Sequence, residues 1–378
     1  MKKNFYIVLA MMLIYITIPK YTFASEISND VLEEQKNEYG ISSFINEAKK
    51  YTEEFDVSEI FKASVSGKFD NNNIIKLISK ILGKNLKETL LTISGIIVIV
   101  IINSILKAIS ENLGNDSVSK IAYYIQYILI ITLVMSNFSK VINEMKVAIQ
   151  DLTSFSNTLI PVMTTLIIAT GNMTTSSVIE PILLLLITFI GNFVTNILIP
   201  ILLVATAIGL ISKISDQVQI TKLSKYMKKS SVWILTTVLT IFIGIASLEG
   251  GLTSNIDGVT KKAGKSIVAA AVPVVGNILG DAIETLAGYS NIIKNATGVV
   301  GIVVILSICL KPIINLAMFT IVYYLAASLC EPVADGKVVE IIEQMAETFK
   351  VMLAVMFTIT TMIIVGLAIV MKITSWKY

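Results

Sequence analysis

The chain has 378 residues, of which 54% are hydrophobic and only 15% charged, so it is more apolar than a soluble domain needs to be. All 30 basic residues are lysine, and the absence of histidine and arginine excludes His-activated nucleophiles, His-ligated zinc and arginine clamps for phosphate. Both cysteines, Cys309 and Cys330, lie in apolar runs without CxxC spacing, which indicates core packing rather than a disulfide or a metal site. We therefore expect a non-enzymatic, all-α, polytopic membrane protein that uses no cofactor and binds no nucleic acid.

Residues 1–24 have the pattern of a secretory signal peptide. Lys2 and Lys3 precede a 14-residue apolar core, and a small-residue ending favours cleavage after Ala24. An uncleaved first anchor is the alternative, because this core is short for a membrane span but does not exclude one.

Residues 25–73 form a polar, acidic segment that we expect outside the cytoplasm as a small helical region. Positions 26 to 70 carry eleven acidic residues against five lysines, and apolar residues recur at helical spacing from Ile41 to Phe55. The segment is too short to bury a substantial core. A solvated spacer and a docking surface for an extracytoplasmic partner are both open interpretations.

Residues 74–88 are typical of an amphipathic helix at the membrane surface. Lys76, Lys80, Lys84 and Lys87 recur at helical spacing opposite isoleucine and leucine. This pattern predicts a helix lying on lipid headgroups, and a helix that fills a groove on a partner is the alternative.

Six apolar stretches are candidate membrane spans: 89–106, 121–138, 177–211, 231–248, 296–329 and 350–371. The first two belong to a region at 89–150. Two further apolar pieces, 159–171 and 267–279, fall below the ~20 residues of a full span, so each is a re-entrant helix or a crossing lengthened by its flanks. The two longest stretches exceed a ~30 Å hydrocarbon core, which predicts either tilted and kinked helices or tight hairpins.

Proline spacing indicates that the rest of the chain is a duplication, with repeats at 151–262 and 263–378. Pro161 and Pro200 are 39 residues apart, and so are Pro273 and Pro312. Each half also has a short Pro-containing helix, a polar linker, a long apolar segment broken by a proline, a charged stretch and a final span. Repeats of Pro-broken helices point to transporter-like architecture. Five lysines at 213–229 favour a cytoplasmic position for that stretch, but parallel and inverted repeats both remain open.

Lys311 and Pro312 are the strongest candidates for lining or gating a passage through the membrane. An ionisable residue inside a span is costly unless it faces water or protein, and a proline frees a backbone carbonyl that can line a cavity. Pro200 is the matching position in the first repeat. The alternative places Lys311 at a hairpin turn, from which it snorkels to the membrane surface.

Asp281, Glu284 and Lys294 are further candidates for a pathway. The two carboxylates share one helical face and the lysine follows, which suggests an ion-lined vestibule, with a solvated helix end as the alternative. Small residues at near-helical spacing predict close helix packing, within one chain or between copies in a ring. This packing surface centres on Pro273, Gly276 and Gly280.

The arrangement as a whole resembles a known family. The stretches Pro273-Val274-Val275-Gly276, Asp281-Ala282 and Lys294-Asn295-Ala296 with Gly298 are similar to the stage III sporulation protein AE family of spore-forming bacteria. The export signal, the acidic segment and the repeated membrane region extend this resemblance over essentially the full length, although no catalytic motif supports it. The resemblance implies a membrane core of the channel-like secretion apparatus that joins mother cell and forespore during engulfment.

The resemblance also implies a location and partners. We expect a homo-oligomer in the mother-cell membrane facing the forespore, together with ring-forming bitopic proteins, a separate cytoplasmic ATPase and small membrane proteins of the same operon. The chain itself has no nucleotide-binding motif. Two other functions remain open: a secondary transporter with a midplane site near Pro200 and Pro312, and a scaffold that anchors the exterior ring proteins.

Overall fold

We analysed the fold in a computed structural model of the chain. It describes residues 39–52, 56–66, most positions of 94–105, and residues 116–214, 220–245, 276–332, 334 and 336–372. In these ranges every regular element is helical and none is a strand, which confirms the predicted all-α fold. Five of the helices have the length and composition needed to cross a membrane.

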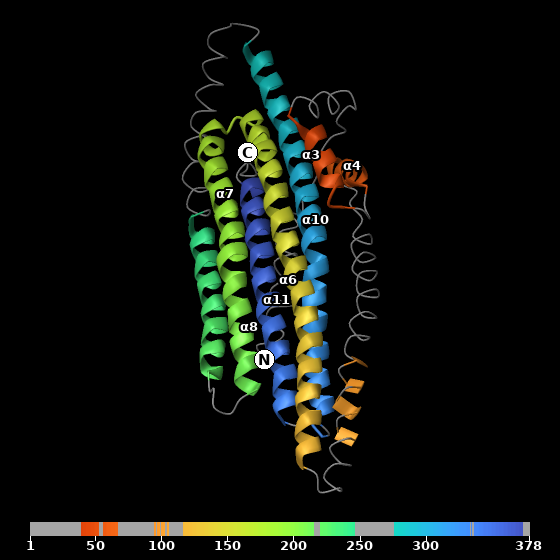
Figure 1. Ribbon diagram of the computed structural model, residues 1–378. Coiled ribbons are helices and arrows are strands. Elements are labelled where there is room, and N and C mark those ends of the chain that lie inside the picture. Colours follow the sequence, from red (N-terminus) through yellow and green to blue (C-terminus); the bar gives the residue numbers. More distant parts are fainter. Residues whose placement is uncertain are drawn as a thin grey trace.

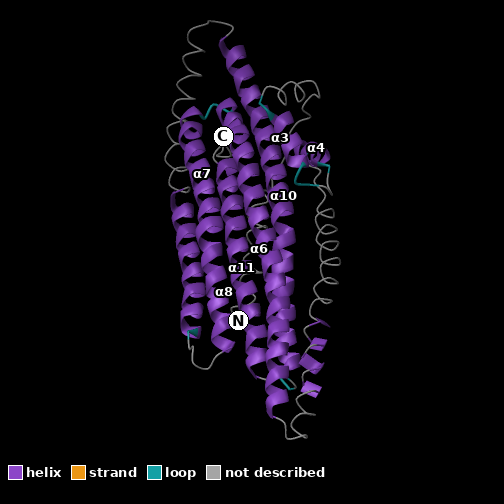
Figure 2. Ribbon diagram, in the orientation of Figure 1, coloured by secondary structure: helices purple, strands orange, loops and turns teal. Residues whose placement is uncertain are grey.

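The long helices lie side by side in one elongated bundle (Figure 1). The helices are α3 (Ile41–Lys49), α4 (Val57–Val65), α6 (Asp116–Ala169), α7 (Met173–Phe193), α8 (Ile199–Ile214), a helix at Thr221–Ile245, α10 (Gly276–Cys330) and α11 (Gly336–Lys372). Figure 2, coloured by secondary structure, shows helix along the whole height of the bundle. Helices α6 and α11 run in one direction, and α7, α8 and α10 run in the other.

Helix α11 forms the centre of the bundle. No residue of 351–371 is exposed, because α6, α7, α8 and α10 pack around it. Where α6, α10 and α11 meet, the ring of Phe349 lies 5.2 Å from the rings of both Phe319 and Tyr323. The ring of Phe138 lies 6.3 Å from the same phenylalanine. These contacts place Phe138, Tyr323 and Phe349 at one level of the bundle.

Helix α6 differs from the expectation that a span at 121–138 and a short apolar piece at 159–171 are separate elements. The structure has one helix of 54 residues from Asp116 to Ala169. The polar residues between the two apolar stretches remain helical because the apolar residues among them, such as Met145 and Leu152, are buried at helical spacing. The short piece is therefore the end of a longer crossing, and a re-entrant helix at this position is wrong.

Neither of the two longest apolar stretches forms a hairpin. Helix α10 continues through Lys311 and Pro312 as one 55-residue helix, so the predicted alternative of a turn at Lys311 is wrong. Helices α7 and α8 are joined without a break by a π-helical turn, Val194–Leu198, which lies just before Pro200. A π turn at this position accommodates the hydrogen bond that the proline cannot donate. At ~1.5 Å per residue α10 reaches roughly 80 Å, well beyond a ~30 Å hydrocarbon core.

The predicted small helical region before the spans is present as α3 and α4. Helix α3 packs against α6, with the rings of Phe44 and Tyr51 5.8 Å and 5.7 Å from the ring of Phe155. Helix α4 packs against α10. Burial raises the pKa of Tyr51, and the carboxylates of Glu47 and Asp151 raise it further, so this phenol docks in its neutral form. The extracytoplasmic position of these helices stays a prediction.

Several predictions fall on residues outside the described ranges. They concern the signal peptide at 1–24, the surface helix with Lys76, Lys80, Lys84 and Lys87, and Pro273. Of the four prolines that indicate the repeat, Pro161, Pro200 and Pro312 lie in α6, α8 and α10. Because the fourth is not described, the internal repeat stays a prediction.

Candidate functional site

The uncharged half of α11 indicates which part of the bundle fits into a bilayer. Residues 351–371 contain no charge, and Lys350 and Lys372 flank them. These 21 residues measure about 31 Å at ~1.5 Å each, which matches the ~30 Å thickness of a hydrocarbon core. We use this stretch as the reference for depth in the membrane and call it the hydrocarbon layer.

The helix Thr221–Ile245 agrees with this reference. Its Lys228 Nζ donates a hydrogen bond to Thr348 Oγ1 at 2.7 Å, so the two helices are level just below the hydrocarbon layer. From this level the helix continues without a charge from Ser230 to Ile245. Both helices therefore change from charged to uncharged at the same height.

Helix α6 crosses the same layer. Its Phe138 is level with Phe349, just before the uncharged half of α11 begins. Its Leu159 lines a cavity together with Leu367 and Val370, which lie near the end of that half. The α6 residues between positions 138 and 159 consequently pass through the whole hydrocarbon layer.

The exposed face of α6 in this layer is polar. Between positions 140 and 157 the exposed residues follow one another at intervals of three and four, the spacing of one helical face. We call this face the α6 polar stripe, and it consists of Lys140, Asn143, Val147, Gln150, Ser154 and Asn157. Only Val147 is apolar. A helix in contact with lipid at this depth would present an apolar face instead.

Three amide side chains in the stripe have no partner in the described part of the chain. Those of Asn143, Gln150 and Asn157 make no hydrogen bond with any residue that the structure describes. Exposed threonine hydroxyls on the helix Thr221–Ile245 behave differently, because each donates to the backbone carbonyl four residues earlier at 2.9–3.0 Å. These threonines are Thr236, Thr237 and Thr240. A threonine satisfied in this way tolerates lipid, whereas an amide with free donors and acceptors requires water or protein.

Lys311 lies near the middle of the hydrocarbon layer and is exposed. It lies between Tyr323, which is in the aromatic cluster, and Lys294, which is at the end of α11. One turn further along α10, Asn315 Nδ2 donates to the carboxylate of Glu144 on α6 at 2.8 Å. Residues four apart share a helical face, so Lys311 lies on the side of α10 that reaches toward α6.

The other sequence-predicted pathway residues lie in α8 and at several heights along α10. Pro312 is buried in α10 and Pro200 is exposed on α8, and their predicted lining of a passage stays a prediction. The first turns of α10 contain Asp281 and Glu284, and also Gly276 and Gly280. The structure describes only their backbone, and their predicted roles in a vestibule and in helix packing stay predictions.

Lys294 is fully buried and holds the end of α11 against α10. Its Nζ donates to the carbonyl oxygen of Met371 at 2.9 Å. The last carbonyls of a helix have no partner within the helix, and a cation there also complements the helix dipole. This geometry gives Lys294 a clear structural function, and its predicted role in a vestibule stays a prediction.

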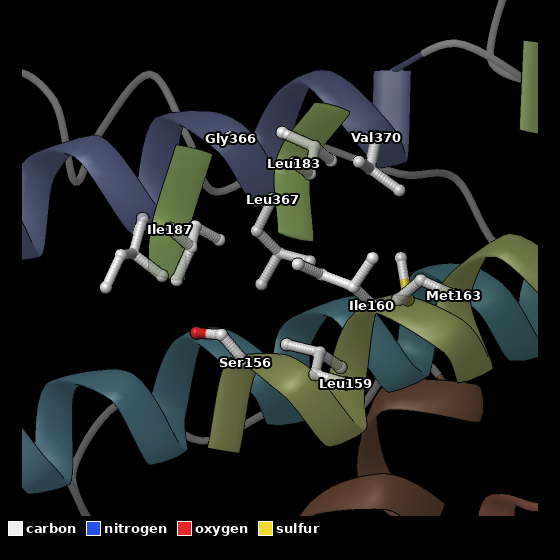
Figure 3. Close-up of a pocket in the computed structure, with 10 residues that line it drawn as sticks. Ser156, Leu159, Ile160, Met163, Leu183, Ile187, Gly366, Leu367 and Val370 are labelled. Atoms are coloured by element: carbon white, nitrogen blue, oxygen red, sulfur yellow. The ribbon is translucent and has the colours of Figure 1, made fainter. Parts of the chain in front are cut away.

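Two small cavities are bounded by described residues of the bundle. The larger, of ≈ 20 Å³, is bounded by α6, α7 and α11 and is apolar except for Ser156 (Figure 3). The Oγ atom of Ser156 has no hydrogen-bond partner among the described residues. The smaller cavity measures ≈ 10 Å³ and includes Gly191 and Phe242 in its lining. Each has room for about one water molecule, so neither is large enough for a transported substrate.

Sequence reasoning missed the α6 polar stripe because residues 139–158 lie between the apolar stretches 121–138 and 159–171 and belong to neither. The signal was available in the spacing of Asn143, Gln150 and Asn157, which fits one helical face. Apolar residues such as Met145 and Leu152 occupy the opposite face. A low average hydropathy in this region concealed an amphipathic helix.

Comparison with known proteins identifies the family of this chain. A sequence model of the family described as stage III sporulation protein AE matches residues 55–374. The chain is also 26% identical, over 275 residues, to the stage III sporulation protein AE of Bacillus subtilis (strain 168). The aligned region covers 73% of this chain and 69% of that protein. No solved structure matches the chain. On the extent of the family match, the chain belongs to the stage III sporulation protein AE family.

Proposed function

We propose that the chain is a membrane core subunit of a conduit between mother cell and forespore, and that the α6 polar stripe lines this conduit. The family and five candidate spans support a sporulation protein of the membrane. The observation that carries the finer proposal is the stripe itself, a polar helical face that extends through the hydrocarbon layer. In this proposal the chain forms or gates a passage for other molecules and does not catalyse a reaction.

The physical argument is the cost of the alternative environment. Leaving one amide without a hydrogen bond in an apolar medium costs roughly 2–7 kcal/mol, and a lysine at the centre of a span costs about 2.5–3.5 kcal/mol. The three amides of the stripe would therefore cost on the order of 10 kcal/mol in lipid. Water or protein must cover the stripe. A closed ring of identical copies turns such a face toward a shared aqueous centre.

Lys311 extends this polar surface onto α10. It is exposed near the middle of the layer, one turn from the hydrogen bond between Asn315 and Glu144. Rings of charged side chains at close quarters select ions and polar solutes in membrane pores. Copies arranged around an axis would bring several Lys311 ammonium groups and Glu144 carboxylates to one level, where they restrict passage.

Energy and anchoring come from partner proteins in this proposal. They are a separate cytoplasmic ATPase and ring-forming bitopic proteins of the same operon, in the mother-cell membrane that faces the forespore. The sequence contains no nucleotide-binding motif. Normal spore formation in cells that contain this chain but lack the ATPase would contradict the proposed dependence.

To test whether the stripe lines a conduit, its three amide residues are replaced by leucine. We expect the triple variant Asn143→Leu, Gln150→Leu, Asn157→Leu to accumulate in the membrane at the normal level but to lower the heat-resistant spore titre sharply. The matched control replaces three exposed threonines on the lipid-facing helix Thr221–Ile245. It is Thr236→Leu, Thr237→Leu, Thr240→Leu, and it should retain the normal titre. Equal titres for both variants, at equal protein levels, would favour the scaffold and overturn the conduit.

In the described part of the chain, no observation favours an autonomous secondary transporter. Its expected midplane site joins Pro200 and Pro312, yet the first is exposed and the second buried. The two described cavities, of ≈ 20 Å³ and ≈ 10 Å³, are too small for a substrate. Saturable, ion-coupled uptake by purified protein in liposomes would restore this function.

A further inference from the structure

The helix Thr221–Ile245 carries a basic and aromatic face where it meets the hydrocarbon layer. Its lysines at 222, 225 and 229 follow one another at intervals of three and four, so they share one side of the helix, and all three are exposed. Two aromatic residues lie beside them. We call the set the basic-aromatic face, and it consists of Lys222, Lys225, Tyr226, Lys229 and Trp233.

This face points away from the rest of the described chain. Tyr226 and Trp233 are each 69% exposed, which is unusual for large aromatic side chains in a folded bundle. Only 22% of the apolar stretch of this helix is buried, against 44–61% for the other four candidate spans. Figure 1 shows the helix in green at the edge of the bundle. Lipid is therefore the neighbour of this helix along most of its length.

The charge on the face is not neutralised within the described chain. None of Lys222, Lys225 and Lys229 makes a hydrogen bond or an ion pair with another described residue. The neighbouring Lys228 is buried and turns inward to Thr348, so it does not belong to the face. The lysines also lie in the first turns of the helix, where the macrodipole adds further positive potential. This arrangement attracts an anion rather than a neutral partner.

We propose that the basic-aromatic face binds the headgroups of anionic phospholipids at the membrane surface. Lysine side chains snorkel to phosphates, while tyrosine and tryptophan favour the boundary between headgroups and hydrocarbon. A protein surface in contact with water alone would not need exposed aromatic side chains beside its lysines. Lys229 is the last charge before the uncharged part of the helix, so its phosphate contact lies at the edge of the layer defined by α11. The lipid contact fixes the depth of the bundle in the membrane.

The test uses the position of Trp233 as a reporter. The full-length chain has one other tryptophan, Trp376, and Trp376→Phe leaves a single fluorophore. This protein is reconstituted into bilayers that contain the same mole fraction of either phosphatidylglycerol or phosphatidylcholine brominated close to the headgroup. Bromine quenches tryptophan only at short range, so the two quenching efficiencies compare the lipids that surround Trp233. We expect stronger quenching by the brominated phosphatidylglycerol.

The variant Lys222→Gln, Lys225→Gln, Lys229→Gln should make the two quenching efficiencies equal. A lysine near an anionic surface contributes about a fivefold preference, so three contribute roughly a hundredfold at low salt and less at high salt. The control variant Lys49→Gln, Lys50→Gln changes exposed lysines on the distant α3 region and should retain the preference. Equal quenching in the unsubstituted protein, or a preference that survives the triple substitution, would overturn the proposal. Neither result depends on whether the α6 polar stripe lines a conduit.

Discussion

Replacing Lys294 tests the register in which α10 and α11 pack. The side chain is fully buried, and its ammonium group donates to the carbonyl of Met371 at 2.9 Å across 77 residues of sequence. Lys294→Ala removes three of the four stem carbons as well as the donor. Lys294→Met retains most of the volume and removes only the donor and its charge.

The burial and the hydrogen bond of Lys294 set the expected loss of unfolding free energy. Truncating a buried side chain of this length to alanine costs about 2–5 kcal/mol, and a carbonyl left without its donor costs about 1–3 kcal/mol more. Removing a buried cation offsets part of this loss of stability, because the desolvation of the ammonium group no longer opposes folding. We expect a net loss of about 3 kcal/mol for Lys294→Ala and about 1 kcal/mol for Lys294→Met. At roughly 2 °C per kcal/mol, the alanine variant should unfold about 6 °C lower.

The assay is thermal unfolding of purified protein in detergent, followed by circular dichroism. The control is Lys49→Ala on the exposed face of α3, which should change stability by less than about 0.5 kcal/mol. If Lys294→Ala unfolds at the same temperature as the unsubstituted protein, Lys294 does not hold the end of α11. The register of α10 against α11, and with it the depth of Lys311, would then need to be revised.

Two further substitutions test other contacts of the bundle. Thr348→Val removes the acceptor for the buried ammonium of Lys228 and should cost about 1–3 kcal/mol in thermal unfolding, whereas Thr348→Ser should retain stability. An unaffected valine variant would place that lysine outside the bundle. Gly191→Leu should destabilise by at least about 1–3 kcal/mol, because the side chain of Thr153 already fills the space beside this glycine. Gly244→Leu has open space around it and is the control, and equal effects of the two would contradict close packing of α6 on α7.

The spans were predictable because lipid imposes a simple requirement on composition. A run of about 20 uncharged residues, such as 351–371, has few structures open to it other than a membrane helix. The same reasoning identified the apolar part of the helix Thr221–Ile245. The exclusion of imidazole chemistry had a separate basis, because it depends only on the absence of histidine from the sequence.

The continuity of α6 and α10 was not predictable from local composition. Hydropathy averages treat 139–158 as a break, but this part of α6 is held in place by contacts with residues far away in the sequence, such as the ring contact of Phe155 with Phe44. In α10 the sequence offered a turn at Lys311 because charge and proline are adjacent there. A proline within a long helix removes one backbone hydrogen bond, and packing of the buried Pro312 against its neighbours outweighs that loss.

The candidate site was predictable only where a single residue stands out from its neighbours in the sequence. Lys311 could be identified because a charge in an apolar run is conspicuous in any sequence. Lys294 was also identified, but its hydrogen bond with Met371 depends on the register of two helices, which no local pattern encodes. The α6 polar stripe needed the depth reference supplied by α11. Its residues are ordinary for a soluble helix and become informative only when their height in the membrane is known.

The most direct measurement of the central claim is the accessibility of single cysteines to a membrane-impermeant maleimide in native membranes of sporulating cells. Cysteines are introduced at Asn143, Gln150 and Asn157 in the stripe, and at Leu185 and Phe189 on the exposed apolar face of α7. The natural cysteines are buried and contribute little background. We expect labelling at the three stripe positions and none at the two α7 positions. Stripe cysteines that remain as unreactive as those on α7 would show that no water reaches this face, and would contradict the conduit.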